Sequence, residues 1–378
     1  MAALDLPRDR TLELGFLSPH NPYDRRTFSG SSFFAARALS RRPDVRLRIL
    51  GHTHAPSGLH RLLRKKPSAL RPEQMDLDGL DAVVGLVATP LLNRIARSHP
   101  DLPLIHVTDA TPHFLRDAYG WAIPVEADAA ESDIARHAAA IVYSSDAIAR
   151  RAPRDLGIGG LTASVIPFGV NFEDLPPLPR KPPLDKINLL FVGIDWTRKG
   201  GDIAVAALDH LRAGGRDATL TVVGRCPERH RGHPAIHAVG FLDKNKPREK
   251  ARLSDLYGKA HLLLLPSRGD CAPMVIAEAM AHATPVLATD TGGIASLIGG
   301  GAAGRVLPLH AAPDIWATTI AGMTADQDTY RFLSEASFDR AQTRLCWENW
   351  AACIETLARR IKMKDEWRES DVKAAVAV

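Results

Sequence analysis

Residues 262–293 read LLLLPSRGDCAPMVIAEAMAHATPVLATDTGG, and this stretch decides the fold. The apolar run 262–265 is too short for a helix and ends at a proline, which predicts a buried strand. After a polar turn, Pro273 suits the first turn of a helix, which we expect to extend to about His282. Residues 286–288 predict a second strand. The order strand, helix, strand is typical of a parallel sheet covered by helices.

The helix after Pro273 carries a single formal charge, Glu278, between Cys271 and Ala283. A surface helix normally has charged residues along its solvent face, whereas this one is rich in alanine. A helix packed on nearly all sides is expected to direct its one acid into a cleft, although a solvated glutamate is the alternative. Asp270 lies in the turn at the carboxyl end of the strand, where open α/β sheets bind ligands. We therefore expect both acids to face one crevice.

Seven residues separate Asp270 from Glu278, and Ala-Met-Ala, Thr-Pro-Val and Thr-Gly-Gly-Ile follow. This pattern resembles the signature of retaining, nucleotide-sugar-dependent glycosyltransferases of the group 1 (family 4) class. Most members have a glutamate at the first position; Asp270 keeps the charge but is one methylene group shorter. The resemblance implies an α/β protein of the GT-B type, in which two Rossmann-like, doubly wound domains face each other across a cleft.

The length of 378 residues suits two domains rather than one core. Strand patterns alternate with helical stretches at residues 12–17, 45–50, 82–87, 104–107 and 139–144, and the alternation restarts at 188–192 and 218–223. Between the two series, residues 173–184 contain five prolines and predict a linker. We divide the chain into an acceptor-binding domain (1–175), a nucleotide-sugar-binding domain (176–345) and a final helix (346–378). The resemblance implies that this helix returns to the first domain.

The loop 193–201, GIDWTRKGG, is the second chemical centre of the sequence. Arg198 and Lys199 are predicted to stand at the entrance of a helix, where two cations and free backbone N–H groups make a diphosphate site. The alternative is an ordinary surface pair of basic residues. The loop, which begins at Gly193, resembles the family's VGR…KG loop, whose Arg and Lys neutralise the leaving diphosphate. Ile194 stands at the usual Arg position, so Arg198 is expected to share the work with Lys199.

Two loops of the first half are candidates for the acceptor side of the cleft. Gly30, in Ser-Gly-Ser before a helical stretch, would let a ligand approach the helix end. The loop TDATPH carries Asp109 and His113 after a predicted strand. Many family members place a histidine near this point, close to the transferred sugar. Either side chain could take that catalytic role, and Asp109 could instead cap the next helix.

The resemblance also assigns roles in donor binding. It implies that Glu278 holds the ribose hydroxyls, that Asp270 holds the sugar hydroxyls, and that Lys199 and Asp270 take part in catalysis. The remaining donor-site residues that it implies are Arg225, Phe241, Leu242, Met274 and Val275. No Asp-x-Asp metal motif occurs in either predicted crevice, and the sequence has no Cys-x-x-Cys pair, so we expect neither a metal ion nor a cofactor other than the donor itself.

The net charge of +5 permits an anionic partner. The densest basic run, residues 60–71, contains few aromatic residues, which argues against nucleic acid. The favoured interpretation of this run is a solvated basic face, and the second is peripheral contact with an anionic membrane. The sequence has no signal-peptide core and no apolar run of roughly 18 residues, so we expect a cytoplasmic protein. If it contacts a membrane, we expect that contact to be peripheral and at the inner face.

The expected function is transfer of a sugar, with anomeric retention, from a nucleotide diphosphate sugar to an acceptor hydroxyl of a glycan, a lipid-linked molecule or a small molecule. Two alternatives stay open. A nucleotide-sugar epimerase of the same fold would also need the diphosphate site. A non-catalytic basic binding protein would need no pair of acids.

Overall fold

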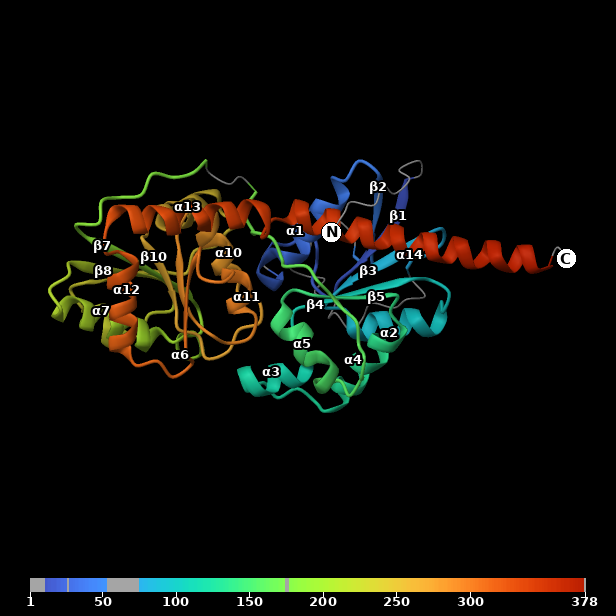
Figure 1. The fold of residues 1–378 in the computed structure, drawn as a ribbon, viewed down its shortest axis with the longest axis horizontal. Coiled ribbons are helices and arrows are strands. Elements are labelled where there is room, and N and C mark those ends of the chain that lie inside the picture. Colours follow the sequence, from blue (N-terminus) through green and yellow to red (C-terminus); the bar gives the residue numbers. More distant parts are fainter. Residues whose placement is uncertain (1–10, 26, 53–74, 174–176, 377–378) are drawn as a thin grey trace.

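The computed structural model describes residues 11–25, 27–52, 75–173 and 177–376, with side chains up to residue 363. The basic run 60–71 lies outside these residues. The described chain forms two lobes, each built on its own sheet (Figure 1). We call them the first domain (β1 to β6) and the second domain (β7 to β12).

The described part of the first domain contains a parallel sheet in the order β2-β1-β3-β4-β5-β6. Its strands are β1 (Leu12–Leu17), β2 (Val45–Leu50), β3 (Ala82–Leu86), β4 (Leu104–Thr108), β5 (Ala140–Tyr143) and β6 (Ser164–Val165). Its helices are η1 (Thr27–Gly30), α1 (Ser31–Ser40), α2 (Thr89–Ser98), α3 (Pro112–Tyr119), α4 (Glu126–His137) and α5 (Asp146–Asp155).

The second domain contains a parallel sheet in the order β12-β11-β10-β7-β8-β9. Its strands are β7 (Ile187–Gly193), β8 (Ala218–Gly224), β9 (Ile236–Gly240), β10 (Leu262–Leu265), β11 (Val286–Thr289) and β12 (Gly304–Leu307). Its helices are α6 (Trp196–Lys199), α7 (Gly201–Ala213), α8 (Glu228–Arg231), α9 (Pro247–Lys259), α10 (Met274–Ala281), α11 (Ile294–Ile298), α12 (Pro313–Met323) and α13 (Gln327–Thr343).

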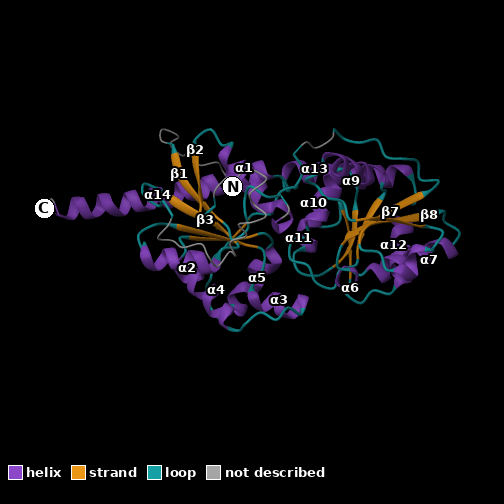
Figure 2. Ribbon diagram, turned by 180° about the vertical axis from the view of Figure 1, so that it is seen from behind, coloured by secondary structure: helices purple, strands orange, loops and turns teal. Residues whose placement is uncertain are grey.

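Helices cover both faces of each sheet, as Figure 2 shows from behind. In the second domain, α9, α10 and α13 pack on one face through residues such as Leu253, Ile276 and Ala341. Helices α7 and α12 pack on the other face through Leu208 and Trp316. Strands enclosed in this way read as continuous apolar runs, because both faces of the sheet are buried. That is why LLLL at β10 predicts a strand although its residues do not alternate.

The last helix, α14 (Trp347–Val376), crosses from the second domain to the first and extends along it (Figure 1). Trp347, Trp350 and Ile354 enter the core that also contains Leu14 and Phe16 of β1. The chain therefore passes between the domains twice, once before β7 and once at the start of α14. The last strand of the first sheet ends at Val165 and the first strand of the second begins at Ile187.

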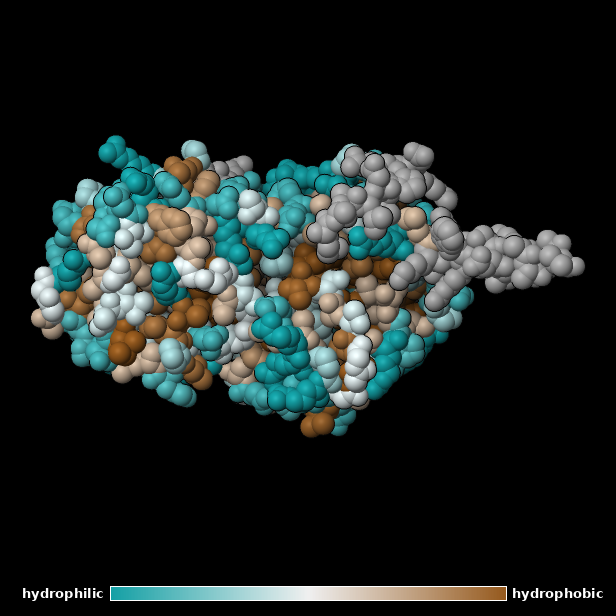
Figure 3. Space-filling view, viewed as in Figure 1, coloured by the Kyte–Doolittle hydropathy of each residue, from teal (hydrophilic) through white to brown (hydrophobic). Residues whose placement is uncertain are grey.

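On the face shown in Figure 3, hydrophobic residues form groups among hydrophilic ones. Among the described residues, no helix is both long enough and apolar enough to cross a membrane.

Candidate active site

The loop after β7 is shaped by three local features. The Asp195 carboxylate caps α6 by accepting the N–H of Arg198 at 3.1 Å, and the Trp196 side chain is buried beneath it. Gly200 has φ = 75°, and a Cβ there would lie 1.9 Å from the carbonyl oxygen of Pro266. Only glycine fits this position. Lys199 thus lies at the end of the short helix α6, separated from α7 by Gly200 alone, and so stands at the entrance of a helix as predicted.

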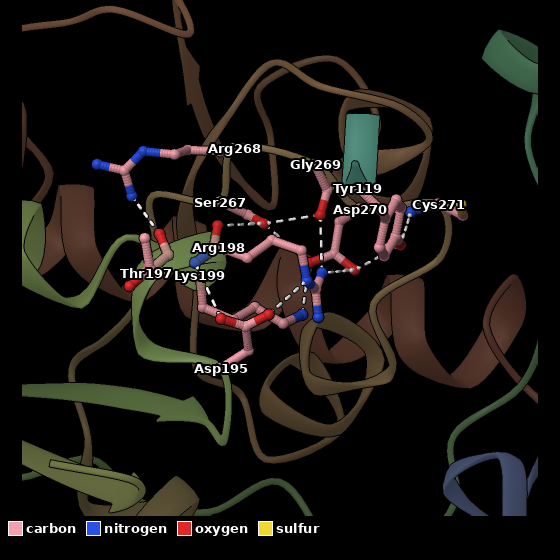
Figure 4. A network of polar contacts seen from close by, with 10 residues as sticks. All are labelled: Tyr119, Asp195, Thr197, Arg198, Lys199, Ser267, Arg268, Gly269, Asp270 and Cys271. Carbon is pink, nitrogen blue, oxygen red and sulfur yellow. Dashed lines mark hydrogen bonds and ion pairs between the residues drawn. The ribbon is translucent and has the colours of Figure 1, made fainter. Parts of the chain in front are cut away.

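Asp270 lies beside Arg198 and Lys199, the two cations predicted for the diphosphate site (Figure 4). Lys199 Nζ contacts Asp270 Oδ2, and Arg198 Nη1 lies 3.8 Å from Asp270 Oδ1. Ser267 donates to Asp270 Oδ2 at 3.1 Å, and Arg198 donates to the carbonyl oxygen of Gly269 at 2.8 Å. Asp270 is only 5% exposed. The cluster leaves little of its charge in contact with solvent.

Tyr119 joins this cluster from the first domain, where it is the last residue of α3. Its hydroxyl group donates to Asp270 Oδ1 at 3.4 Å and accepts the N–H of Cys271 at 2.9 Å. The Arg198 guanidinium lies 4.6 Å from the centre of its ring. Sequence reasoning missed Tyr119, because 151 residues separate it from Asp270. The one available signal was its place on the helix that follows the TDATPH loop.

Glu278 is 2% exposed, so the alternative of a solvated helix glutamate is wrong. Its Oε1 lies 2.7 Å from Lys244 Nζ, and its Oε2 accepts the hydroxyl of Tyr257 at 3.1 Å. Lys244 also donates to the carbonyl oxygen of Ser29, in the first domain, at 3.4 Å. Glu278 therefore belongs to a hydrogen-bond network that is separate from the one around Asp270.

Asp109 follows β4 directly and is half-buried. Burial raises the pKa of its carboxyl group to about 6, and the negative charges of Asp270 and Glu131 add to this effect. Asp109 does not cap α3, because the hydroxyl group of Thr111 accepts the N–H of Phe114 at 3.1 Å in that role. The capping alternative is therefore wrong. The charge of Asp270 reaches Asp109 across the domain boundary.

His113 lies one turn further along and has a different neighbour. Its Nε2 is 3.2 Å from Asp117 Oδ2 on the same helix, and both side chains are largely exposed. The charge of Asp270 acts on the other first-domain candidate, Asp109.

Further predicted donor-site residues lie at the carboxyl ends of β7, β8 and β9, which are neighbours in the second sheet. A Cβ at Gly193 would lie 3.1 Å from Lys199 Cγ, so the backbone passes close to the lysine stem. Arg225 is exposed and Phe241 is 69% exposed, whereas Leu242 is buried in the second core. Phe241 thus presents an apolar ring to solvent.

Met274 and Val275 begin α10, and both are partly buried. Met274 packs against the core of the first domain and Val275 against that of the second. The amino-terminal end of α10 therefore lies where the two domains meet, which is the position that the resemblance implies for donor binding.

The loop before α1 has an unusual backbone. Phe28 (φ = 48°), Ser29 (φ = 56°) and Gly30 (φ = 95°) are all in the left-handed region, which costs roughly 1–2 kcal/mol for a residue other than glycine. The carbonyl oxygen of Ser29 accepts a hydrogen bond from Asn171 Nδ2 at 2.9 Å. Gly30 gives the N-cap of α1 its left-handed conformation.

A pocket beside this loop is lined from both domains. Its lining residues are Arg25, Ser29, Phe34, Asn171, Phe172, Glu173, Lys244 and Lys250. It carries cations on both sides and opens next to the Lys244–Glu278 pair. Within the described ranges, no group of three or more His, Cys, Asp or Glu side chains is placed to hold a metal ion.

Two solved structures resemble the arrangement of both domains. The sucrose-phosphate synthase of Thermosynechococcus elongatus matches with a TM-score of 0.68 at 19% identity, over 93% of this chain and 99% of that chain. HepE of Anabaena, solved in complex with UDP, matches with a TM-score of 0.62 at 16% identity, over 92% and 100%. The molecule therefore has the two-domain α/β architecture of GT-B glycosyltransferases, as the sequence predicts.

Residues 186–326 match the family model described as glycosyl transferases group 1. The chain is 28% identical to a D-inositol 3-phosphate glycosyltransferase of Xylanimonas cellulosilytica, over 69% of this chain and 67% of the relative. It is also 28% identical to the glycogen synthase of Mycobacterium tuberculosis, over 68% and 61%. A phosphatidyl-myo-inositol mannosyltransferase of Mycolicibacterium smegmatis is 31% identical over 47% of each chain. The second domain therefore matches the group 1 glycosyltransferases, as the motifs around Asp270 and Glu278 predict.

Proposed function

We propose that the protein transfers a sugar, with retention of its anomeric configuration, from a nucleotide diphosphate sugar to an acceptor hydroxyl group. The observation that carries this proposal is the cluster of Lys199, Arg198 and Asp270 at the domain boundary. Each cation is paired with a carboxylate, Lys199 with Asp270, and Arg198 with Asp195 at 3.1 Å as well as with Asp270. A diphosphate group that entered here would compete with these carboxylates for both cations, because it carries several negative oxygens.

In this proposal Lys199 and Arg198 stabilise the negative charge that grows on the diphosphate as the bond to the sugar breaks. This electrostatic role needs no divalent ion. Asp270, released from Lys199 by the diphosphate, accepts hydrogen bonds from sugar hydroxyl groups. Glu278 accepts hydrogen bonds from the ribose hydroxyl groups, which replace Lys244 and Tyr257 as the partners of its carboxylate.

Retention is proposed to occur by attack on the face that the diphosphate leaves. The bond from the anomeric carbon to the phosphate oxygen breaks while the bond to the acceptor oxygen forms. The acceptor proton passes to the departing phosphate. Asp109 lies within the electrostatic reach of Asp270, where it can accept a hydrogen bond from the sugar or the acceptor. Neither carboxylate is needed as a covalent nucleophile in this scheme.

The names of the relatives indicate acceptors with several hydroxyl groups, namely an inositol phosphate, a phosphatidylinositol and a glucan. We therefore propose a polyhydroxylated acceptor, either a glycan or a lipid-linked molecule. A lipid-linked acceptor would bring the protein to an anionic membrane surface. The comparisons do not favour an epimerase or a non-catalytic basic binding protein.

The test is incubation with a panel of nucleotide sugars and candidate acceptors, with nucleoside diphosphate release as the readout. We expect release with one donor, unchanged activity in the presence of a chelator, and an α-linked product from an α-linked donor by NMR. Product of the opposite configuration would contradict retention. Loss of activity in chelator and its recovery on adding Mn²⁺ would contradict the electrostatic role of Lys199 and Arg198.

A further inference from the structure

Tyr119 is the point at which the first domain reaches the donor-side cluster of the second (Figure 4). Asp270 has side-chain partners in Lys199, Arg198, Ser267 and Tyr119, and of these only Tyr119 comes from the first domain. The same hydroxyl group accepts the N–H of Cys271 at 2.9 Å. One phenol group therefore bridges the side chain of Asp270 and the backbone of the residue after it.

The ring of Tyr119 makes a second contact, with Arg198. The guanidinium lies 4.6 Å from the ring centre, a distance at which a cation is attracted to an aromatic face. Arg198 is also bound to Asp195 at 3.1 Å and to the carbonyl oxygen of Gly269 at 2.8 Å. Among the described residues that orient the Arg198 guanidinium, Tyr119 is thus the one that comes from the first domain.

The backbone holds Tyr119 in this place. A Cβ at Gly269 would lie 2.0 Å from the carbonyl oxygen of Ala118, so the two domains touch backbone to backbone beside the tyrosine. The ring also packs against Trp121, with centroids 4.9 Å apart, and against Phe114, with centroids 6.3 Å apart. Its hydroxyl group cannot move far unless the domains separate.

We propose that Tyr119 is a positioning residue of the donor site, supplied by the first domain and engaged only when the domains are closed. The hydroxyl group orients Asp270 toward the transferred sugar, and the ring holds Arg198 toward the diphosphate. Burial and the charge of Asp270 raise the pKa of the phenol, so it stays protonated and able to donate. This inference rests on the proposed function of Asp270 and Arg198.

The two parts of the side chain can be tested separately. Tyr119→Phe keeps the ring and removes the hydroxyl group. We expect kcat to fall at least about tenfold, the effect of one lost hydrogen bond to a charged group, while the Kd for the nucleoside diphosphate without sugar changes less than about 2-fold. Tyr119→Leu removes the ring as well and should also weaken nucleoside diphosphate binding, by about 3-fold or more.

Tyr330→Phe is the matched control. Tyr330 lies in α13, is buried, and donates to the carbonyl oxygen of His261 at 3.1 Å. This variant also loses one buried hydroxyl group, at a similar expected cost in stability, but outside the donor site. It should keep the wild-type kcat and Kd.

Alkylation of Cys271 gives a measurement that does not depend on turnover. Cys271 is buried, and its backbone N–H donates to the hydroxyl group of Tyr119. Alkylation of the native protein, located by peptide mass spectrometry, should label Cys271 faster in Tyr119→Leu than in the wild type. Labelling of Cys226, which is buried inside the second domain, should not change.

Three outcomes would overturn the inference. The first is a wild-type kcat in Tyr119→Phe while the wild type turns over its donor. The second is faster turnover or tighter nucleoside diphosphate binding in that variant, which would make Tyr119 an obstacle that donors displace. The third is equal labelling of Cys271 in Tyr119→Leu and wild type. A wild type that uses no nucleotide sugar would instead refute the proposed function, and the labelling would still decide whether Tyr119 holds the contact.

Discussion

At the scale of single residues, the carboxyl group of Asp109 shows how a site can work against stability. It is half-buried and lies close enough to Asp270 and Glu131 for their charges to oppose its ionisation. Its pKa of about 6 exceeds the ordinary value of 3.8, so the folded state binds the proton more tightly than the unfolded state. The stability that comes from this group is complete below about pH 4 and is lost as the pH rises through about 6.

Asp109→Asn should therefore have opposite effects on stability and on turnover. At pH 7.5 we expect the free energy of unfolding to rise by about 1–3 kcal/mol, because an ionised buried carboxylate is removed; at pH 4 we expect no gain. Turnover should fall at least about tenfold, which corresponds to about 1.4 kcal/mol at the transition state. Urea unfolding at both pH values and the initial transfer rate measure these effects.

Wild-type turnover in Asp109→Asn, together with the pH-dependent gain in stability, would leave Asp109 outside the reaction. His113 would then be the better first-domain candidate.

Lys244 is expected to stabilise the fold, because its ammonium group pairs with the buried carboxylate of Glu278. Lys244→Met leaves that carboxylate with the hydroxyl group of Tyr257 as its remaining side-chain partner among the described residues. We expect the free energy of unfolding at neutral pH to fall by about 1–3 kcal/mol, the cost of a buried charged group that has lost a partner. Lys246→Met is the control, because Lys246 lies two residues away, pairs with Glu249 and is 65% exposed.

The Lys246 variant should change the unfolding free energy by less than about 0.5 kcal/mol. Equal losses in the two lysine variants, measured by urea unfolding, would mean that Glu278 does not depend on Lys244.

At the scale of elements, the turn between α6 and α7 depends on a glycine for two distinct reasons. Gly200 is left-handed (φ = 75°) and also touches the Pro266 carbonyl, whereas Gly215 is left-handed (φ = 85°) with open space around it. Alanine should strain the backbone at either position by roughly 1–2 kcal/mol. Only Gly200→Ala should in addition displace Lys199, and we expect nucleoside diphosphate affinity to fall at least about tenfold.

Isothermal titration calorimetry of the two variants makes this comparison. Similar affinities in Gly200→Ala and Gly215→Ala would show that the close approach to Pro266 does not position Lys199.

Several elements could be predicted from the sequence because their boundaries are local. Strands β1, β2 and β10 have the predicted bounds. β10 is an apolar run closed by a proline, whereas β2 alternates apolar residues with Arg46 and Arg48. Helix α6 could not be predicted in this way. It has four residues and exists because Asp195 caps it and Trp196 is buried beneath it, which are properties of the folded domain.

Lys199 and Asp270, which were both predicted as donor-site residues, lie together, because both are in loops at the carboxyl ends of neighbouring strands. Tyr119 and Lys244 were missed for the opposite reason. Their contacts with Asp270 and Ser29 cross between domains, and the relative position of two domains leaves no periodic trace in the sequence.

At the scale of the whole molecule, the two domains are joined by covalent crossings and by a charged cluster at the pocket between them. Glu173, which opens the predicted linker, lies 2.5 Å from Arg25 and 3.2 Å from Arg37 of the first domain. On the other side it lies 3.3 Å from Lys250 of α9 in the second domain. One carboxylate thus holds together three cations that would otherwise repel one another across the boundary.

Glu173→Gln should weaken the closed arrangement. The amide leaves Arg25, Arg37 and Lys250 without the charge that pairs them, and we expect closure to lose about 1–2 kcal/mol, between the value of an exposed pair and that of a buried one. Small-angle X-ray scattering should give a larger radius of gyration, and Cys271 should be alkylated faster because Tyr119 separates from it. Raising the salt concentration should move the wild type in the same direction, since salt screens the cluster.

Glu335→Gln, an exposed position of α13, removes the same charge from the second domain and should change neither measurement. The comparison also separates two causes of opening. If Glu173→Gln exposes Cys271 but Tyr119→Leu does not, the charged cluster alone sets closure and the tyrosine only follows it. If both variants expose Cys271, and the double variant exposes it more than either, the cluster and Tyr119 hold the two ends of one interface. We expect the second result, because the two residues contact different elements of the second domain. Glu173 contacts α9, and Tyr119 contacts the loop after β10.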